Sequence, residues 1–264
     1  MRATALGLVA ALLSGCGAQC LRPVAGLPAL THAARAANGG RAIAVQLTSD
    51  AVTGRIDRQV TALLTGHGIP VTRLNSLEYF WREKPPERLG ADLAALIGAA
   101  TPPGTGPPVL LVGYSMGADA LPFAVNRLPP AVRRRVVLVV LLNPAADAVF
   151  EFHVPQWWDE LRGPAQSTLP EFARMAALGV PVVCIYGRED RDAACPHLAP
   201  GEAERVALAG GHHYGADPEE LARALRASLA ARGLIAARPP VGGAYAPGSG
   251  SEPSSTPSNS AVDR

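Results

Sequence analysis

Four nearly continuous apolar runs constrain the fold of this chain more than any other feature. They read PVLLVG (108–113), VVLVVLL (136–142), VPVVCIYG (180–187) and RVALAG (205–210), and AIAVQL (42–47) and IPVTRL (69–74) precede them. Strands of this kind are covered on both faces, as in a parallel sheet between layers of helices. We therefore expect these six segments to be strands of one sheet.

Segments with the apolar spacing of helices lie between these predicted strands. Two helices are indicated by apolar residues three or four positions apart, Ile56, Val60, Leu63 and Leu64 in the first and Leu89, Leu93, Leu96 and Ile97 in the second. The last helix is marked at both ends. It has an N-cap (Asp217), a first-turn proline (Pro218), a capping-box acid (Glu220), an apolar stripe (Leu221, Leu225 and Leu229) and a glycine at its end (Gly233). The alternation predicts an α/β fold, with a mostly parallel sheet of at least six strands and helices on both faces.

The 264 residues provide enough apolar material for one globular domain, since 48% are hydrophobic. We predict this domain over residues 41–236. Residues 21–40, rich in Ala, Gly and Pro, are expected to be a linker, and the Pro/Gly/Ser-rich residues 237–264 a disordered tail. The net charge of +2 gives no reason to expect a nucleic-acid partner, and we predict no cofactor and no metal.

The first twenty residues, MRATALGLVAALLSGCGAQC, have the charged start and apolar middle of a secretory signal. The run ends in Leu-Ser-Gly-Cys, which matches the bacterial lipobox, so Cys16 is the predicted lipidation site. The alternative is an ordinary signal peptide that contains a cysteine. We expect an exported protein, tethered by lipid on the periplasmic side of a bacterial membrane.

Export changes the interpretation of the other cysteines, because thiols pair in an oxidising compartment. Cys184 and Cys195 lie eleven positions apart. A disulfide between them would brace the loop after the strand that contains Cys184. The alternative is two unpaired thiols.

Residues 113–117, Gly-Tyr-Ser-Met-Gly, stand where a predicted strand ends and a predicted helix begins. Glycines at both ends let the chain reverse sharply and hold the serine hydroxyl on a strained, exposed tip. Ser115 is therefore a candidate nucleophile. The Met116 N–H is a candidate oxyanion donor, and a second donor is expected at about Asp50 or Ala51 in the loop after the first strand. Asp119 is expected to stabilise the N-terminus of the helix, with recognition of a substrate ammonium as the alternative.

A serine nucleophile needs a base and an acid, and both follow later strands. The Gly-Gly before His212 lets a loop present this imidazole to Ser115, and His213 is the alternative base. Asp190 is the expected orienting acid, with Glu189 and Asp192 as alternatives. The order serine, acid, histidine is the one that an α/β-hydrolase requires.

Longer segments carry a family resemblance. GIPVTRLNSLEYFW, GYSMGADALPFAVNRLP, FEFHV, VVCIYGRED with its following cysteine, and GGHHY resemble the AcvB/VirJ family of exported bacterial proteins across nearly all of residues 42–231. The resemblance implies a periplasmic serine hydrolase that removes the amino acid from aminoacyl-phosphatidylglycerol, such as lysyl-phosphatidylglycerol. It also implies a link to virulence and to type IV secretion components. Ser115, Asp190 and His212 take the catalytic positions of the family.

One departure concerns the substrate. The family has Gly-Asp-Gly-Gly-Trp where this chain has Ser-Asp-Ala-Val-Thr at 49–53, so only the aspartate is shared. The change alters the expected oxyanion loop. It leaves two alternatives open, a general esterase or thioesterase, and a degenerate hydrolase that serves as a secretion-linked binding protein.

Overall fold

The computed structural model describes residues 24–35, 40–50, 54–101, 106–151, 165–215 and 217–236. The predicted signal sequence with Cys16, the predicted tail, and Ala51 all lie outside the described residues. Among the described residues, no helix has the length and apolarity needed to cross a bilayer.

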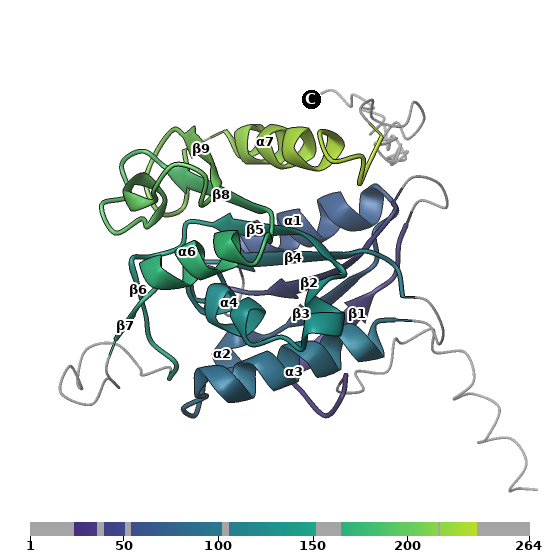
Figure 1. Cartoon of the computed structure of the whole chain (residues 1–264). Coiled ribbons are helices and arrows are strands. Elements are labelled where there is room, and N and C mark those ends of the chain that lie inside the picture. The colour runs from purple at the N-terminus through teal and green to yellow at the C-terminus, as the bar shows by residue number, and fades with distance from the viewer. Residues whose placement is uncertain are drawn as a thin grey trace, which may run out of the picture.

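A seven-stranded sheet with helices on both faces forms the centre of the molecule (Figure 1). Its order is β1-β3-β2-β4-β5-β8-β9, and every neighbouring pair is parallel except β1 with β3. The strands are β1 (Ala29–His32), β2 (Ile43–Leu47), β3 (Val71–Leu74), β4 (Val109–Tyr114), β5 (Val136–Leu142), β8 (Val182–Gly187) and β9 (Glu204–Leu208). The predicted α/β class, with a mostly parallel sheet of at least six strands, is confirmed.

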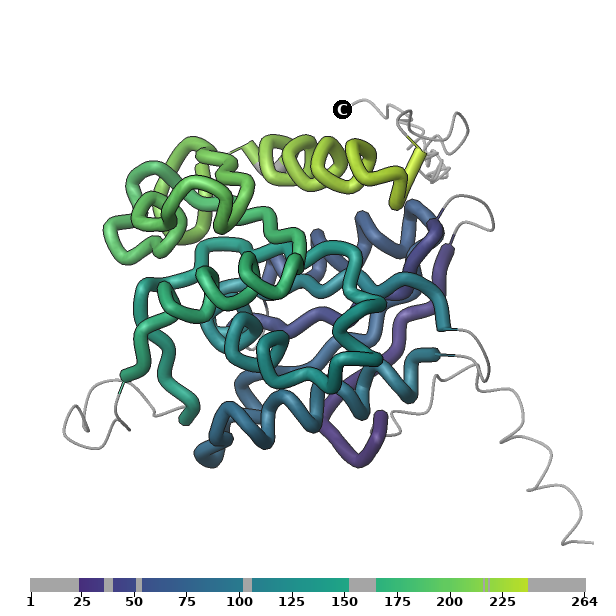
Figure 2. Tube along the Cα trace, viewed as in Figure 1, coloured from purple at the N-terminus to yellow at the C-terminus, as the bar shows by residue number. Residues whose placement is uncertain are grey.

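Two layers of helices cover the sheet, and each has its own apolar cluster. Helices α1 (Arg55–Gly66) and α7 (Pro218–Ala230) pack on one face, and Figure 2 shows α7 beside α1. On the other face lie α3 (Pro86–Ala99), α4 (Met116–Asn126) and α6 (Leu169–Ala177). Strands β4 and β5 are buried on both sides, which explains their nearly continuous apolar sequence.

Short elements complete the described fold. They are α2 (Ser76–Tyr79), α5 (Pro130–Arg133), the small hairpin of β6 (Asp147–Ala148) and β7 (Gln166–Ser167), and a 3₁₀ turn, η2 (Cys195–His197). All of them lie in connections between the main strands and helices. These lengths are too short to leave a periodic pattern in the sequence.

The predicted linker is wrong over Ala29–His32. These residues form β1, which pairs antiparallel with β3, Ala29 opposite Leu74 and His32 opposite Val71. Leu27 and Ala29 are buried in the core beneath the edge of the sheet. An edge strand pairs through its backbone and buries few side chains, so this segment carries no long apolar run and resembles a linker in sequence.

Candidate active site

The nucleophile turn is built by close backbone packing at the carboxyl end of β4. Ser115 has φ 52° and ψ −124°, a strained conformation for a residue with a side chain. A Cβ on Gly113 would collide with the backbone of Gly117 and Ala118, and one on Gly117 would collide with the carbonyls of Leu47 and Thr48. Glycine at both positions therefore lets α4 begin directly against the end of β2.

Three predicted residues form one hydrogen-bonded chain at this edge. His212 Nε2 lies 2.9 Å from Ser115 Oγ, and His212 Nδ1 lies 2.7 Å from Asp190 Oδ2. The Asp190 side chain is 7% exposed, whereas that of His212 is 37% exposed. A buried carboxylate that accepts from Nδ1 leaves Nε2 unprotonated toward the serine, which is the arrangement needed to remove the hydroxyl proton.

The alternative base and acids, His213, Glu189 and Asp192, make other contacts. His213 Nδ1 lies 2.8 Å from the hydroxyl of Tyr114. The amide of Asp192 donates to Asp190 Oδ1 at 3.2 Å, so Asp192 supports the acid with its backbone. The backbone N–H of Glu189 donates to the Gly210 carbonyl at 3.0 Å, which ties the acid loop to the base loop.

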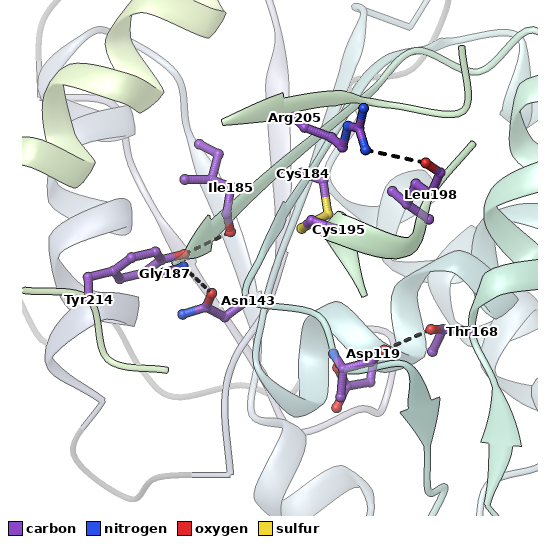
Figure 3. Close-up of a disulfide and its surroundings, with 11 residues drawn as sticks. Asp119, Asn143, Thr168, Cys184, Ile185, Gly187, Cys195, Leu198, Arg205 and Tyr214 are labelled. Carbon is purple, nitrogen blue, oxygen red and sulfur yellow. Dashed lines mark hydrogen bonds between the residues drawn. A yellow bond between two sulfur atoms is a disulfide. The ribbon is translucent and has the colours of Figure 1, made fainter. Parts of the chain in front are cut away.

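Asn143 joins the acid loop to the base loop, and the sequence reasoning missed it. This residue directly follows β5, is fully buried, and has φ 47°. Its Oδ1 accepts from the Gly187 N–H at 2.8 Å (Figure 3), while its Nδ2 donates to the His212 carbonyl. The available signal was a polar residue placed immediately after an apolar strand, at the edge where ligands bind in parallel sheets.

Cys184 and Cys195 form a disulfide beside these loops, with their Cα atoms 5.8 Å apart (Figure 3). Cys184 lies in the middle of β8, three residues before Gly187 and six before Asp190. Both cysteines are fully buried. The bond fixes the returning η2 segment against β8 and so braces the loop that presents the acid.

A buried carboxylate, Asp57 in α1, binds the start of the loop after β2, which is the predicted oxyanion loop. Its Oδ2 accepts from the Ser49 hydroxyl at 2.7 Å and from the Ser49 N–H at 3.2 Å, and Oδ1 accepts from the Gln46 side chain. Burial raises the pKa of Asp57, and the bonds from Ser49 and Gln46 oppose that rise. These contacts fix the start of the predicted oxyanion loop.

The predicted oxyanion donors are the Met116 N–H and an N–H at Asp50 or Ala51. Met116 begins α4, and the first amides of a helix have no acceptor within that helix. Its N–H is therefore suited to an oxyanion at Ser115. Asp50 is exposed beside Ser115 at a common cavity, whereas Ala51 lies outside the described residues.

Asp119 lies in the first turn of α4, as expected for a residue that stabilises the helix N-terminus, and its carboxylate also contacts a neighbouring loop. Its Oδ1 accepts from the Ala145 N–H at 2.7 Å, on the loop after β5. Burial raises the pKa of Asp119 to about 8, with Asp50 and Asp190 adding to the rise and the Ala145 bond opposing it. Asp119 therefore ties α4 to the neighbouring loop, and its raised pKa favours the protonated form.

In the described ranges, no group of three or more His, Cys, Asp or Glu side chains is arranged to hold a metal ion. Glu151 is described, but His153, its partner in the FEFHV stretch, lies outside those ranges. What the described residues bring together is a serine, an imidazole and a carboxylate.

One family of known proteins matches most of this chain. A profile of the family described as "Bacterial virulence protein (VirJ)" matches residues 41–233. A search of curated proteins found no match.

Solved structures share the fold at low identity. Est1E from Butyrivibrio proteoclasticus, solved with ferulic acid, has a TM-score of 0.56 at 13% identity, over 77% of this chain and 94% of its own. The esterase domain of a Rhodothermus marinus protein has a TM-score of 0.54 at 15% identity, over 76% and 91%. The monoacylglycerol lipase of Paleococcus ferrophilus has a TM-score of 0.53 at 14% identity, over 77% and 98%. The fold is that of the α/β-hydrolases.

Proposed function

This chain belongs to the bacterial virulence protein (VirJ) family, and from that premise we propose that it is an exported serine hydrolase of aminoacyl-phosphatidylglycerol. The bond cleaved is the ester between the amino acid and the glycerol headgroup, as in lysyl-phosphatidylglycerol. The observation that carries the proposal is the hydrogen-bonded chain from Ser115 through His212 to Asp190.

The reaction proceeds in two acyl transfers. Ser115 Oγ attacks the ester carbonyl while His212 Nε2 takes the hydroxyl proton, and the Met116 N–H stabilises the oxyanion. His212 then gives this proton to the leaving oxygen, which releases phosphatidylglycerol and leaves the aminoacyl group on Ser115. Water repeats the sequence, with His212 as base, and frees the amino acid. Asp190 stabilises the imidazolium that forms in each step.

The predicted anchor supports a lipid substrate. A lipid on Cys16 would hold the protein at the periplasmic side of the membrane, where it meets phospholipid substrates in two dimensions. Type IV secretion components remain proposed partners, on the basis of the family alone.

A general esterase or thioesterase is the second candidate function. It is favoured by the altered loop at 49–53, where the glycines and the tryptophan of the family pattern are replaced. Esterases and a lipase among the structures of the same fold agree with this candidate. A degenerate hydrolase that acts as a binding protein is the third candidate, and the intact hydrogen-bonded chain argues against it.

The test is release of amino acid from vesicles that contain lysyl- or alanyl-phosphatidylglycerol, using the full chain. We expect release by the wild type, none by Ser115→Ala, and normal release by Ser167→Ala, a matched control at an exposed serine of β7. Hydrolysis of p-nitrophenyl acetate without release from either lipid would replace the proposal with the general esterase. Absence of both activities in folded protein would favour the binding protein.

A further inference from the structure

A cavity of about 200 Å³ opens beside the nucleophile, on the side of helix α1. Ser115 and Tyr114 form its wall at the nucleophile turn, and His213 lines it from the base loop. Asp50 and Arg55 line it from the segment after β2, together with Ile56. The cavity therefore combines the reacting hydroxyl with one acidic and one basic side chain.

Arg55 supplies the permanent positive charge of this cavity. It is exposed at the start of α1. Within the described ranges the arginine ion pairs belong to other residues, namely Arg88, Arg127, Arg174, Arg223, Arg226 and Arg232. Arg55 forms no ion pair with a carboxylate of the described residues, and a guanidinium in this position beside the candidate serine is suited to an anionic group of the substrate, because its planar fork matches phosphate oxygens.

The leaving group belongs on the same side. The leaving alcohol must take its proton from His212, and the adjacent His213 lines the cavity. In aminoacyl-phosphatidylglycerol, three carbons and one oxygen separate the scissile ester oxygen from phosphorus. A flexible arginine that lines the cavity of Ser115 can therefore meet the phosphate.

We infer that Arg55 binds the phosphodiester of the leaving group and so sets a preference for esters whose leaving group carries a phosphodiester. This inference rests on the proposed function. Asp50 limits the charge that the cavity accepts, since a carboxylate repels a doubly charged phosphate monoester more than a singly charged diester. The same carboxylate attracts the ammonium of the aminoacyl group, so the two side chains together fit a zwitterionic ester.

The experiment compares two esters with the same acyl group, lysyl-phosphatidylglycerol in vesicles and lysine ethyl ester, which lacks phosphate. Arg55→Gln is expected to lower the ratio of their kcat/KM values, lipid over ethyl ester, by about tenfold or more, because one charge-assisted contact is lost. Arg55→Lys should restore part of the ratio, since the charge is kept without the fork. Arg58→Gln is the matched control, because Arg58 lies on the same helix but lines a different cavity.

A binding measurement separates this inference from the proposed function. Ligand-observed NMR with sn-glycero-3-phosphoglycerol, the soluble headgroup, needs no turnover and should show binding to Ser115→Ala protein that Arg55→Gln weakens about tenfold. If the lipid is not cleaved but this binding behaves as expected, the proposed function fails and the Arg55 site stands. Three results would each overturn the inference. They are an equal loss of kcat/KM on both esters in Arg55→Gln, an equal fall of the kcat/KM ratio in Arg58→Gln, and headgroup binding that is unchanged by Arg55→Gln.

Discussion

At the scale of single residues, three aspartates near the nucleophile have different surroundings. Asp190 accepts from an imidazole, Asp57 from a serine hydroxyl and amide, and Asp119 from a backbone amide of a neighbouring loop. The partner of each carboxylate decides its role. Asp190 holds the His212 imidazole, the predicted base; Asp57 holds Ser49 at the start of the predicted oxyanion loop; and Asp119 links α4 to the loop after β5.

Asp119 should make stability depend on pH. Its pKa is raised to about 8 in the folded protein, so between about pH 4 and pH 8 the folded state binds the proton more tightly than the unfolded chain does. The free energy of unfolding should therefore fall as pH rises through this window, by at most about 1.4 kcal/mol per pH unit from this group. Asp119→Asn keeps an acceptor for the Ala145 N–H and removes the titration. Urea unfolding from pH 4 to pH 9 should show a smaller decline for Asp119→Asn, and parallel curves would contradict the assignment.

Asp57 should matter for both stability and rate. Asp57→Ala removes the carboxylate that accepts from the buried Ser49 hydroxyl and N–H, which should cost about 2–4 kcal/mol in the free energy of unfolding. Asp57→Asn retains one acceptor oxygen and should cost less. At a temperature where both variants are folded, kcat should fall more than KM rises, because the oxyanion loop contributes mainly in the transition state. Unchanged kcat in folded Asp57→Ala would show that this network does not position the loop.

Site residues with a recognisable local sequence pattern could be predicted, whereas residues whose roles depend on tertiary contacts could not. Ser115 and His212 are flanked by glycines, and Asp190 follows a strand, so their positions could be predicted. The roles of Asn143 and Asp57 depend on contacts with Gly187, His212 and Ser49, which lie far from them along the chain or in another element. No spacing rule indicates such contacts.

At the scale of elements, the junction of β2, β4 and α4 determines where the serine lies. Gly117 brings the first turn of α4 against the end of β2, and Gly113 allows the turn to close. The two glycines thus set the distance between the nucleophile and the oxyanion loop that follows β2.

Gly117→Ala should disturb this junction. The new methyl group would meet the Leu47 and Thr48 carbonyls, at a cost of about 1–3 kcal/mol in stability. Displacement of the oxyanion loop should lower kcat by about 100-fold. Gly98→Ala in α3 is the control, since nothing lies within 4 Å of the added atom, and it should stabilise the fold by about 0.5–1 kcal/mol. Thermal unfolding and kcat test both variants, and a wild-type kcat in Gly117→Ala protein would show that this junction does not position the oxyanion loop.

The main strands and helices could be predicted because their apolar patterns are long. The N-cap at Asp217 is confirmed, with its side chain accepting from the Glu219 N–H at 2.9 Å. Glu220, expected to complete the capping box, instead accepts from the Ala209 amide at 3.4 Å. That contact comes from the loop before the helix, which local sequence does not reveal.

At the scale of the whole molecule, the parallel sheet gathers the carboxyl ends of β2, β4, β8 and β9 at one edge. The loops after these strands carry the predicted oxyanion donor, the nucleophile, the acid and the base in turn. Strand β1 forms one lateral edge of the sheet and pairs with β3. The matched family range begins at residue 41, so this strand lies outside it.

Removal of β1 should destabilise the domain. A chain that begins at residue 41 loses the four-residue ladder with β3 and the buried Leu27 and Ala29, compared with one that begins at residue 24. We expect the Tm to fall by about 5 °C or more and aggregation to increase, because β3 loses its pairing partner β1 and exposes its own edge. Removal of residues 237–264, predicted to be disordered, is the control and should leave Tm unchanged. Equal Tm values for the chains starting at 24 and 41 would show that β1 adds no stability.

The central claim is that His212 and Asp190 activate Ser115 as a nucleophile. The most direct test is reaction of the full chain with a fluorophosphonate probe, followed by intact mass spectrometry. The wild type and Ser167→Ala should each gain the mass of one phosphonyl group, while Ser115→Ala and His212→Ala should gain none. An unlabelled wild type that is folded by circular dichroism would contradict the claim, and Gly-Tyr-Ser-Met-Gly would then be a structural turn.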